Sequence, residues 1–408
     1  MMRGLFSSLG SHFGIIFVLG WWLFWLLIHN TQMSGVIVAD IYYQFHFLLM
    51  LLGMLVGYIG VSLLQRQRIY THERGRGGLV LSRVWLLVLL TSTAIVILFS
   101  CWKSGVFSMG FREYFEHVRG VGSDAVGSHV TGLNLFDFGL KVFVYPALMA
   151  VFIVLLLSRV RVVVFLVVAV FLIFSFSYLF QVNYPFIFSF FALLLSVHAR
   201  KMMGAECAGC TAKVTFGLMF VFFVVYLAAA NRYGAMDFYG IVVYYFVNYH
   251  TLGFYLYQSS IERMAGHDLT LGVSLLGVLE MYFAKCLQYC LSFDFQSIYV
   301  HNLASSAERV VAMKDGRDSN AFVTSLFTFY RDFGLVGVAG GGFVYGAFLA
   351  LLRMRANFWG VIYFYLLLVG VLSIYTSPFE QPYLWAVPFF VWLLVVGRAR
   401  MVLIGGVK

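Results

Sequence analysis

The chain has 408 residues, of which 62% are hydrophobic and only 11% are charged, and its formal net charge is +10. A soluble domain usually carries about a quarter charged residues, so this composition excludes a soluble enzyme or a soluble binding module. The mean hydropathy of +0.91 indicates a membrane protein with many spans. No small-residue cleavage site follows the first apolar segment, 13–28, and we expect a retained first span rather than a removed signal peptide.

Ten apolar segments are long enough to cross a bilayer. In chain order they are 13–28, 45–64, 79–101, 138–157, 162–180, 183–198, 214–230, 333–352, 357–376 and 383–397. Several of the turns between them are short, as in antiparallel helical hairpins. We therefore expect an all-α polytopic membrane protein that forms a single integral membrane domain over residues 1–408.

The distribution of Lys and Arg predicts the orientation of these spans. If the N-terminus is placed in the cytoplasm, the inner loops hold 16 of the 27 basic residues but only two acidic ones, Glu73 and Glu206. Every inner loop is then basic, as the positive-inside rule requires. We expect both termini in the cytoplasm. The positive net charge is thus a signal of membrane topology and not of nucleic-acid binding.

Two long segments are expected on the outer side of the membrane, 102–137 and 231–332. Charged residues are nearly absent from the middle of the ten spans, and no repeat or duplicated half is visible. Transporters usually keep polar groups or broken helices near the midplane of the membrane. Since the titratable groups of this chain collect in the outer segments, we expect any chemistry at the outer face.

The second outer segment contains two aromatic-rich stretches, 237–258 and 269–298. They would add one hairpin of spans, and so bring the number to twelve, or they would form re-entrant or interfacial helices. We favour the second interpretation because Asn248, Glu280 and Asp294 are costly against lipid. Either arrangement leaves the orientation of the other spans unchanged.

The later part of this segment predicts two helices. His301 and Asn302 precede an amphipathic pattern over 303–314, for which Asn302 suits the N-cap. A second helix is expected to begin after Ser319 and to carry a polar stripe from Asn320 towards the membrane.

Three arginines of this region are candidate ligands for phosphate, because the planar guanidinium donates in pairs and keeps its charge. They are Arg309, Arg317 and Arg331. A solvated surface helix and loop would explain Arg309 and Arg317 equally well.

Arg331 and Asp332 sit where the last outer segment meets a glycine-rich span. A charged pair at a membrane junction costs free energy unless it is paired, solvated or used. The pair is either a mutual salt bridge at a helix end or part of a functional site, and we favour the site. Packing against another span explains the glycines that follow, which include two GxxxG spacings between Gly337 and Gly346.

Three further residues of the outer segments are candidates. Arg119 ends a predicted interfacial helix and either contacts an anionic head group or belongs to a solvated helix end. Arg263 is another cation of the second outer segment. His250 lies among aromatic residues and is either an acid or base or a hydrogen-bonded packing residue.

The segment 320–346 resembles the late-chain signature of Wzy-type O-antigen and oligosaccharide repeat-unit polymerases. In that signature an Asn and a helix of roughly ten residues precede a DFG-x-x-G sequence that enters a glycine-rich span. The matching residues are Asn320, Asp332, Phe333, Gly334 and Gly337. The runs at 249–256 and 109–119 also resemble outer segments of these polymerases. Many relatives carry an Arg-containing turn at the start of a middle span, where this chain has QVNYPFIF.

The resemblance implies a GT-C-like glycosyltransferase of the bacterial inner membrane that acts in lipopolysaccharide biosynthesis. Such an enzyme moves a growing glycan from undecaprenyl pyrophosphate onto a lipid-linked repeat unit at the periplasmic face. A Wzz-type chain-length regulator is the implied partner, and a flippase supplies the substrate. The hypothesis is an inverting transfer. Because the outer segments contain no DxD or ExD pair, we expect a site without metal or other cofactor, in which arginines stabilise the leaving pyrophosphate.

On this hypothesis the site residues fall into two groups. The catalytic candidates are Arg331, Arg317, Arg309, Asp332, His301 and His250, and the substrate-binding candidates are Arg119, Arg263 and Asn320. Among them His301 or His250 would lie near the acceptor, and Asp332 and Asn320 would shape the site.

Two alternative functions remain. An O-antigen ligase shares the donor and the layout, and His301-Asn302 begins like its periplasmic motif, but Ala312 stands where that motif has glycine. A lipid-linked-oligosaccharide flippase would predict charges within the spans and repeat-related halves, which the sequence lacks.

Overall fold

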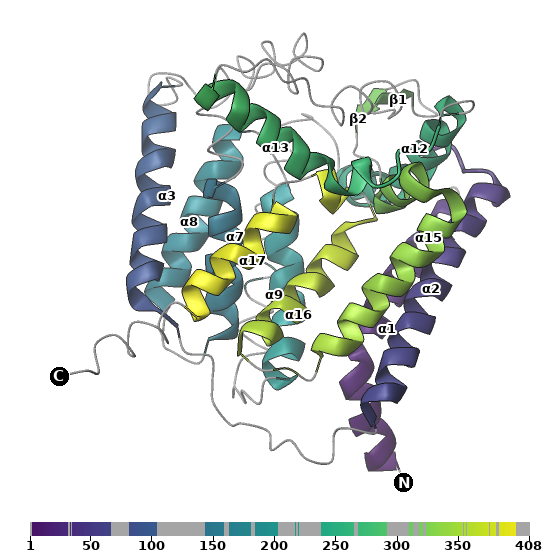
Figure 1. Cartoon of the computed structure of the whole chain (residues 1–408), viewed down its shortest axis with the longest axis horizontal. Coiled ribbons are helices and arrows are strands. Elements are labelled where there is room, and N and C mark those ends of the chain that lie inside the picture. The colour runs from purple at the N-terminus through teal and green to yellow at the C-terminus, as the bar shows by residue number, and fades with distance from the viewer. Residues whose placement is uncertain are drawn as a thin grey trace. The chain divides into compact units, whose positions relative to one another are not determined.

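The computed structural model is almost entirely helical over the residues that it describes (Figure 1). These residues are 2–31, 33, 35–66, 81–103, 143–158, 163–180, 184–202, 217, 219, 238–264, 268–291, 310–312, 318–320, 324–353, 355, 357–374, 376–380 and 383–396. The chain divides into two compact units, and each has its own packing. The first comprises 1–74, 226–355 and 366–381, and the second comprises 75–225, 356–365 and 382–408.

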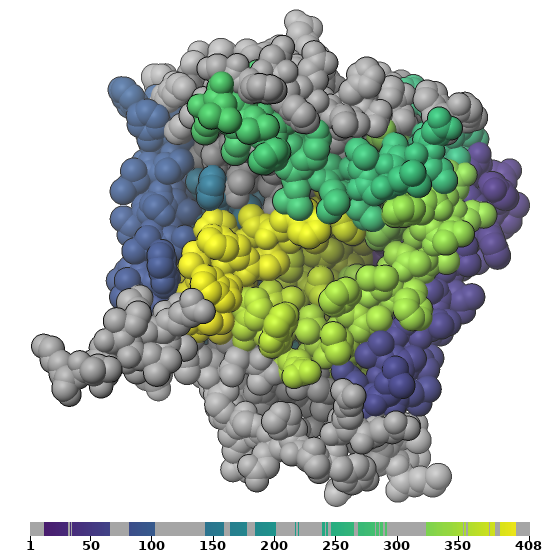
Figure 2. Space-filling view, viewed as in Figure 1, coloured from purple at the N-terminus to yellow at the C-terminus, as the bar shows by residue number. Residues whose placement is uncertain are grey.

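The first unit is built on three long helices, α1 (Met2–Asn30), α2 (Ile41–Arg66) and α15 (Ser325–Leu352). The helices α12 (Tyr249–Arg263) and α13 (Val273–Leu291) both contact α15, and they lie near its upper end in Figure 1. In Figure 2 their side chains, in green, form a band across one end of α15. The short α11 (Phe238–Val242) and the π-helical turn η3 (Val243–Asn248) lead into α12, and a 3-10 turn, η4 (Pro378–Glu380), contacts α13.

The second unit has a buried apolar helix at its centre. Every residue of α7 (Tyr145–Leu157) is buried, and α3 (Arg83–Lys103), α8 (Val163–Phe180), α9 (Tyr184–Met202) and α17 (Tyr383–Val395) pack against it or against one another. The helix α16 (Asn357–Leu372) begins in this unit and ends in the first.

Four of the described helices are long and apolar enough to cross a membrane, namely His12–Asn30, Ile41–Gln65, Arg83–Trp102 and Ser325–Leu352. They correspond to the predicted spans 13–28, 45–64, 79–101 and 333–352. Shorter apolar helices at Tyr145–Leu157, Val164–Ser177, Tyr184–Arg200, Phe358–Leu372 and Leu384–Val395 lie at five further predicted spans. The predicted span 214–230 lies outside the described residues except for Gly217 and Met219.

The outer surfaces of the long helices are apolar, as contact with lipid requires. Leu27, Ile41 and Val336 are among many large hydrophobic side chains that are more than half exposed. Soluble proteins rarely present such extensive apolar surface. The chain is therefore a helical membrane protein.

Glycines allow α2 and α15 to pack closely along their lengths. A Cβ added at Gly53 or Gly57 of α2 would collide with a backbone carbonyl of α15. A Cβ added at Gly342 or Gly346 of α15 would likewise collide with a carbonyl of α2. The predicted packing role of the late glycines is thus confirmed for Gly342 and Gly346, and their partner is α2.

A break divides α15 into two helical segments. Gly334 has φ +60° and ψ −146°, a backbone conformation that essentially only glycine adopts. The segment after the break, up to Leu352, is about 28 Å long at 1.5 Å per residue, close to the thickness of a bilayer's hydrocarbon core. The segment before it turns back, so that Phe329 contacts both Gly337 and Gly341.

The helix predicted over 303–314 is wrong where the structure describes it. The second predicted helix is confirmed as the first part of α15, but it begins later than expected. Val310–Ala312 forms a strand, β1, which pairs antiparallel with β2, Asp318–Asn320. The β-branched Val310 and Val311 favour a strand, and Asp, Ser and Asn compete with the helical backbone for hydrogen bonds. The helix begins only at Ser325, after Thr324 as its N-cap.

Candidate functional site

The break in α15 is held by a short loop that precedes α13. The backbone N–H groups of Thr270 and Leu271 donate to the carbonyl oxygens of Arg331 and Asp332, at 3.0 Å and 3.2 Å. Irregular backbone at membrane depth is tolerated only where protein or water satisfies it. The loop supplies hydrogen bonds to the backbone just before Gly334.

Asp332 caps the N-terminus of α13 from a distant part of the chain. Its Oδ1 accepts hydrogen bonds from the Thr270 hydroxyl and from the Ser274 N–H (2.9 Å), and its Oδ2 accepts from the Leu275 N–H (2.9 Å). The side chain is fully buried. A buried carboxylate is costly unless it is hydrogen-bonded, and the N–H groups and the positive end of the helix dipole stabilise it here. Asp332 therefore fastens α13 to α15.

The loop itself has an uncommon backbone conformation. Leu271 has φ +48° and Gly272 has φ +99°. Positive φ is rare for a residue such as leucine, and strained residues of this kind persist only where the surroundings fix them. The contacts with Arg331 and Asp332 are such surroundings.

Arg331 lies beside this cap and is itself 3% exposed. Its backbone carbonyl accepts from Thr270, and the next residue is the fully bonded Asp332. A guanidinium stays charged when it is buried. The backbone that carries this cation is thus fixed by its own bond to Thr270 and by the bonds of Asp332 to α13. Arg331 lies three residues before the break at Gly334.

His250 of α12 faces α1. Its ring stacks on Trp25 at 4.3 Å and meets Trp21 edge-on at 5.3 Å, and its Nδ1 donates to the carbonyl oxygen of Phe246 at 2.6 Å. The side chain is 1% exposed. These contacts favour the packing interpretation of this histidine.

The structure places only part of the remaining candidates. Arg263 is exposed in the last turn of α12, where a cation complements the helix dipole, and Asn320 belongs to β2. Arg119, His301, Arg309 and Arg317 lie outside the described residues.

One group of residues was missed by sequence reasoning. Tyr42, Tyr43 and His46 of α2 meet Tyr257 of α12 and Tyr330 of α15. The spacing of the first three at the start of a span is the only sequence signal, because the other two come from distant helices.

Within the described part of the chain, no three His, Cys, Asp or Glu side chains gather as ligands for a metal ion would. No family model matches the chain, and no curated protein or solved structure is significantly similar to it.

Proposed function

We propose that the protein is an inverting, metal-independent glycosyltransferase that polymerises undecaprenyl-pyrophosphate-linked repeat units into O-antigen or a related surface polysaccharide. On this proposal it is GT-C-like, has about ten and up to twelve spans, and lies in the bacterial inner membrane with both termini cytoplasmic. The active site faces the periplasm. A Wzz-type regulator is its partner.

One observation supports the proposal most. Three of the residues that resemble the polymerase signature each have a distinct part in the backbone that follows Arg331. Asp332 caps α13, Gly334 breaks α15, and Gly337 admits Phe329. An arrangement that costs this much backbone strain to hold one buried cation fits a site better than it fits simple packing.

The proposed reaction needs a cation of this kind. The acceptor hydroxyl attacks the anomeric carbon of the donor, a new C–O bond forms, and the bond to the pyrophosphate oxygen breaks. Negative charge then grows on the departing pyrophosphate, and a fixed guanidinium stabilises it without reorganisation. We assign this role to Arg331, with Arg309 and Arg317 as further candidates.

The same reaction releases a proton from the acceptor hydroxyl. His301 is the candidate acceptor of that proton, because His250 is enclosed by Trp21 and Trp25. Asp332, with its oxygens bonded to α13, acts as a positioning residue for Arg331.

The test uses the purified full chain, reconstituted with one lipid-linked repeat unit and, in a parallel sample, also with lipid A core. A ladder of products supports a polymerase. Transfer only to lipid A core would instead identify a ligase, and translocation without new bonds would identify a flippase. An unchanged rate in the presence of a chelator is expected, and loss of the ladder would overturn the metal-independent mechanism.

The decisive variant is Arg331→Ala. Loss of a transition-state contact to developing charge should lower turnover by about 10²–10³-fold. Arg331→Lys keeps a positive charge and should retain part of the wild-type turnover. The matched control is Arg355→Ala, an exposed arginine just beyond the other end of the same helix. A full ladder from a correctly inserted Arg331→Ala protein would overturn the assignment.

A further inference from the structure

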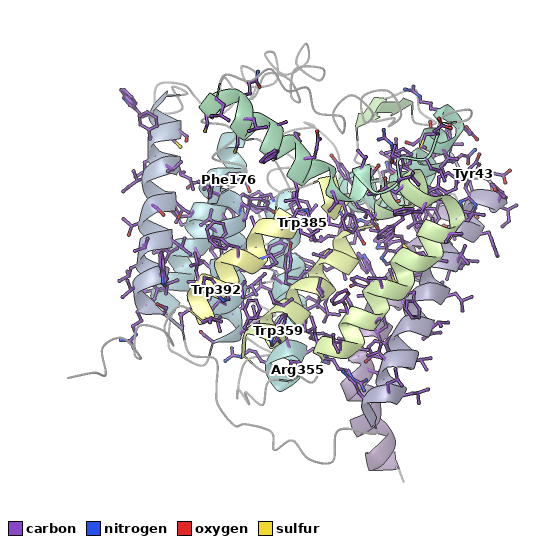
Figure 3. All side chains as sticks on the ribbon, in the orientation of Figure 1. Tyr43, Phe176, Arg355, Trp359, Trp385 and Trp392 are labelled. Carbon is purple, nitrogen blue, oxygen red and sulfur yellow. The ribbon has the colours of Figure 1, made fainter. Side chains whose placement is uncertain are left out.

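Tyr42, Tyr43, His46, Tyr257 and Tyr330 form what we call the tyrosine–histidine cluster. It lies at the N-terminal ends of α2 and α15, beside α12, and Figure 3 labels Tyr43 there. Ring centroids of neighbouring members are 4.8–6.5 Å apart. All five residues belong to the first compact unit.

His46 is the centre of the cluster. It is fully buried, its ring stacks on Tyr330 at 5.6 Å, and its Nδ1 is 2.8 Å from the Tyr257 hydroxyl. Its Nε2 is buried and has no hydrogen-bond partner. A buried polar atom without a hydrogen-bond partner costs free energy, and in native proteins a ligand or a water molecule often supplies the missing hydrogen bond.

The rim of the cluster is polar and accessible. Tyr42 is 55% exposed and packs edge-on against His46 at 4.8 Å. Gln258 accepts from the Asp40 N–H at 2.7 Å and donates to Glu262 at 2.8 Å. The carboxylate of Glu262 also faces the Tyr43 hydroxyl. Aromatic faces therefore lie next to an amide and a carboxylate.

This combination matches the chemistry of a pyranose ring. The C–H face of a sugar packs on an aromatic ring, while its hydroxyls donate to carboxylates and exchange hydrogen bonds with amides and phenols. Tyrosines of an ordinary interfacial belt face the headgroups individually. Here four of them converge on one buried histidine, and Tyr330 directly precedes Arg331.

We propose that the tyrosine–histidine cluster is a glycan subsite that holds a sugar ring of the lipid-linked repeat unit next to Arg331. Tyr42 and Tyr330 provide the stacking faces, and Glu262 accepts from a sugar hydroxyl. His46 Nε2 is the candidate partner of a second sugar hydroxyl. The inference deepens the proposed function and rests on it for the identity of the glycan.

The test measures binding of the free repeat-unit oligosaccharide, released from its lipid by mild acid, to the purified full chain. Tyr42→Ala and Tyr330→Ala should each weaken binding about three- to tenfold, the value of one aromatic stacking contact. Tyr330→Phe keeps the ring and should bind nearly as the wild type does. Tyr239→Ala removes a comparably exposed tyrosine outside the cluster and is the matched control.

A second probe isolates the sugar contribution. Undecaprenyl pyrophosphate without glycan should bind the wild type and Tyr42→Ala equally. Equal oligosaccharide affinities of the wild type, Tyr42→Ala and Tyr330→Ala would overturn the subsite, even if the wild type makes ladders. Cluster-dependent oligosaccharide binding by a protein that makes no ladder would support the subsite and refute the polymerase proposal.

Discussion

Among single residues, Gly334 has the most demanding conformation in the described chain. Its φ and ψ lie in a region that residues with a Cβ atom almost never adopt. The nearest neighbouring atom to an added Cβ, Cδ1 of Leu269, is 4.0 Å away. The requirement for glycine therefore comes from the backbone and not from crowding.

Gly334→Ala should destabilise the protein by about 1–3 kcal/mol, the usual cost of one strained residue. Gly340→Ala in the same helix is the control, since no atom lies within 4 Å of its added Cβ. That substitution should stabilise α15 by about 0.5–1 kcal/mol. Thermal unfolding in detergent compares the two, and equal midpoints would contradict the role of the break.

Asp332 offers a second prediction at this scale. Asp332→Asn keeps one acceptor but turns an amide N–H towards a backbone donor of α13, and Thr270→Val removes the hydroxyl donor. Each should cost about 0.5–2 kcal/mol of stability, as the loss of a cap does. If Asp332 positions Arg331, turnover should fall in both variants.

The contrary result would be a stable Asp332→Asn protein without turnover beside a fully active Thr270→Val protein. Asp332 would then contact the substrate itself. Kinetics and thermal unfolding on the same preparations distinguish the two roles.

At this scale the sequence singled out Arg331, Asp332 and Gly334, because a charged pair at a membrane junction and the glycine after it are local features of the sequence. The partners of the carboxylate were not predictable. Thr270 and Ser274 lie about sixty residues earlier, and ordinary Thr and Ser residues in a loop carry no signal of a contact at that distance. The same holds for Tyr257 and Tyr330 in the tyrosine–histidine cluster.

Between elements, the closest contact of the first unit is that of α2 with α15. Carbonyls of each helix approach glycines of the other, at Gly53 and Gly57 on α2 and at Gly342 and Gly346 on α15. Helices in lipid associate by such close packing rather than by the hydrophobic effect. These two helices carry the break at Gly334 and four of the five residues of the tyrosine–histidine cluster.

Gly346→Ala should therefore separate the two helices, because its Cβ would meet the carbonyl group of Met54. Overpacking of this kind costs about 1–3 kcal/mol. Gly60→Ala gains the same methyl group on α2 with nothing within 4 Å, and should be neutral or stabilising. Unfolding midpoints of the two variants that do not differ would refute the close contact.

Helix periodicity failed at β1 and β2, and the reason is local. An apolar spacing of three and four residues fits a helix at Val310, but Val310 and Val311 in succession also fit a strand. Pairing with Asp318–Asn320 decides between them, and a short pattern contains no information on that pairing.

For the whole molecule, hydropathy located the apolar helices but not how each one is surrounded. The helix α7 is apolar on all sides and buried on all sides, whereas α2 is apolar and largely exposed to lipid. Both satisfy the same sequence criterion, because lipid and a protein core select the same side chains.

The predicted orientation gives a test with single cysteines. In a variant whose five native cysteines are replaced by serine, Asp268→Cys and Arg355→Cys place a thiol before α13 and after α15. Figure 3 labels Arg355 at the end of the first unit away from Tyr43.

If the N-terminus is cytoplasmic, a membrane-impermeant maleimide added to cells with a permeabilised outer membrane should label Asp268→Cys and leave Arg355→Cys unlabelled. Lysis should then expose Arg355→Cys. The opposite pattern would invert the topology and remove the site from the periplasmic face.

The break at Gly334 also orders the events of membrane insertion. The groups that bond Asp332 and its neighbour, at Thr270 to Leu275, leave the ribosome about 3–12 s before Asp332 does, at 5–20 residues per second over 62 residues. A carboxylate and a kinked backbone enter the bilayer boundary only after their partners have been made. The loop from Thr270 to Leu275 is therefore already synthesised when α15 inserts. Delayed synthesis or truncation of this loop would leave Asp332 without its hydrogen-bond donors during insertion.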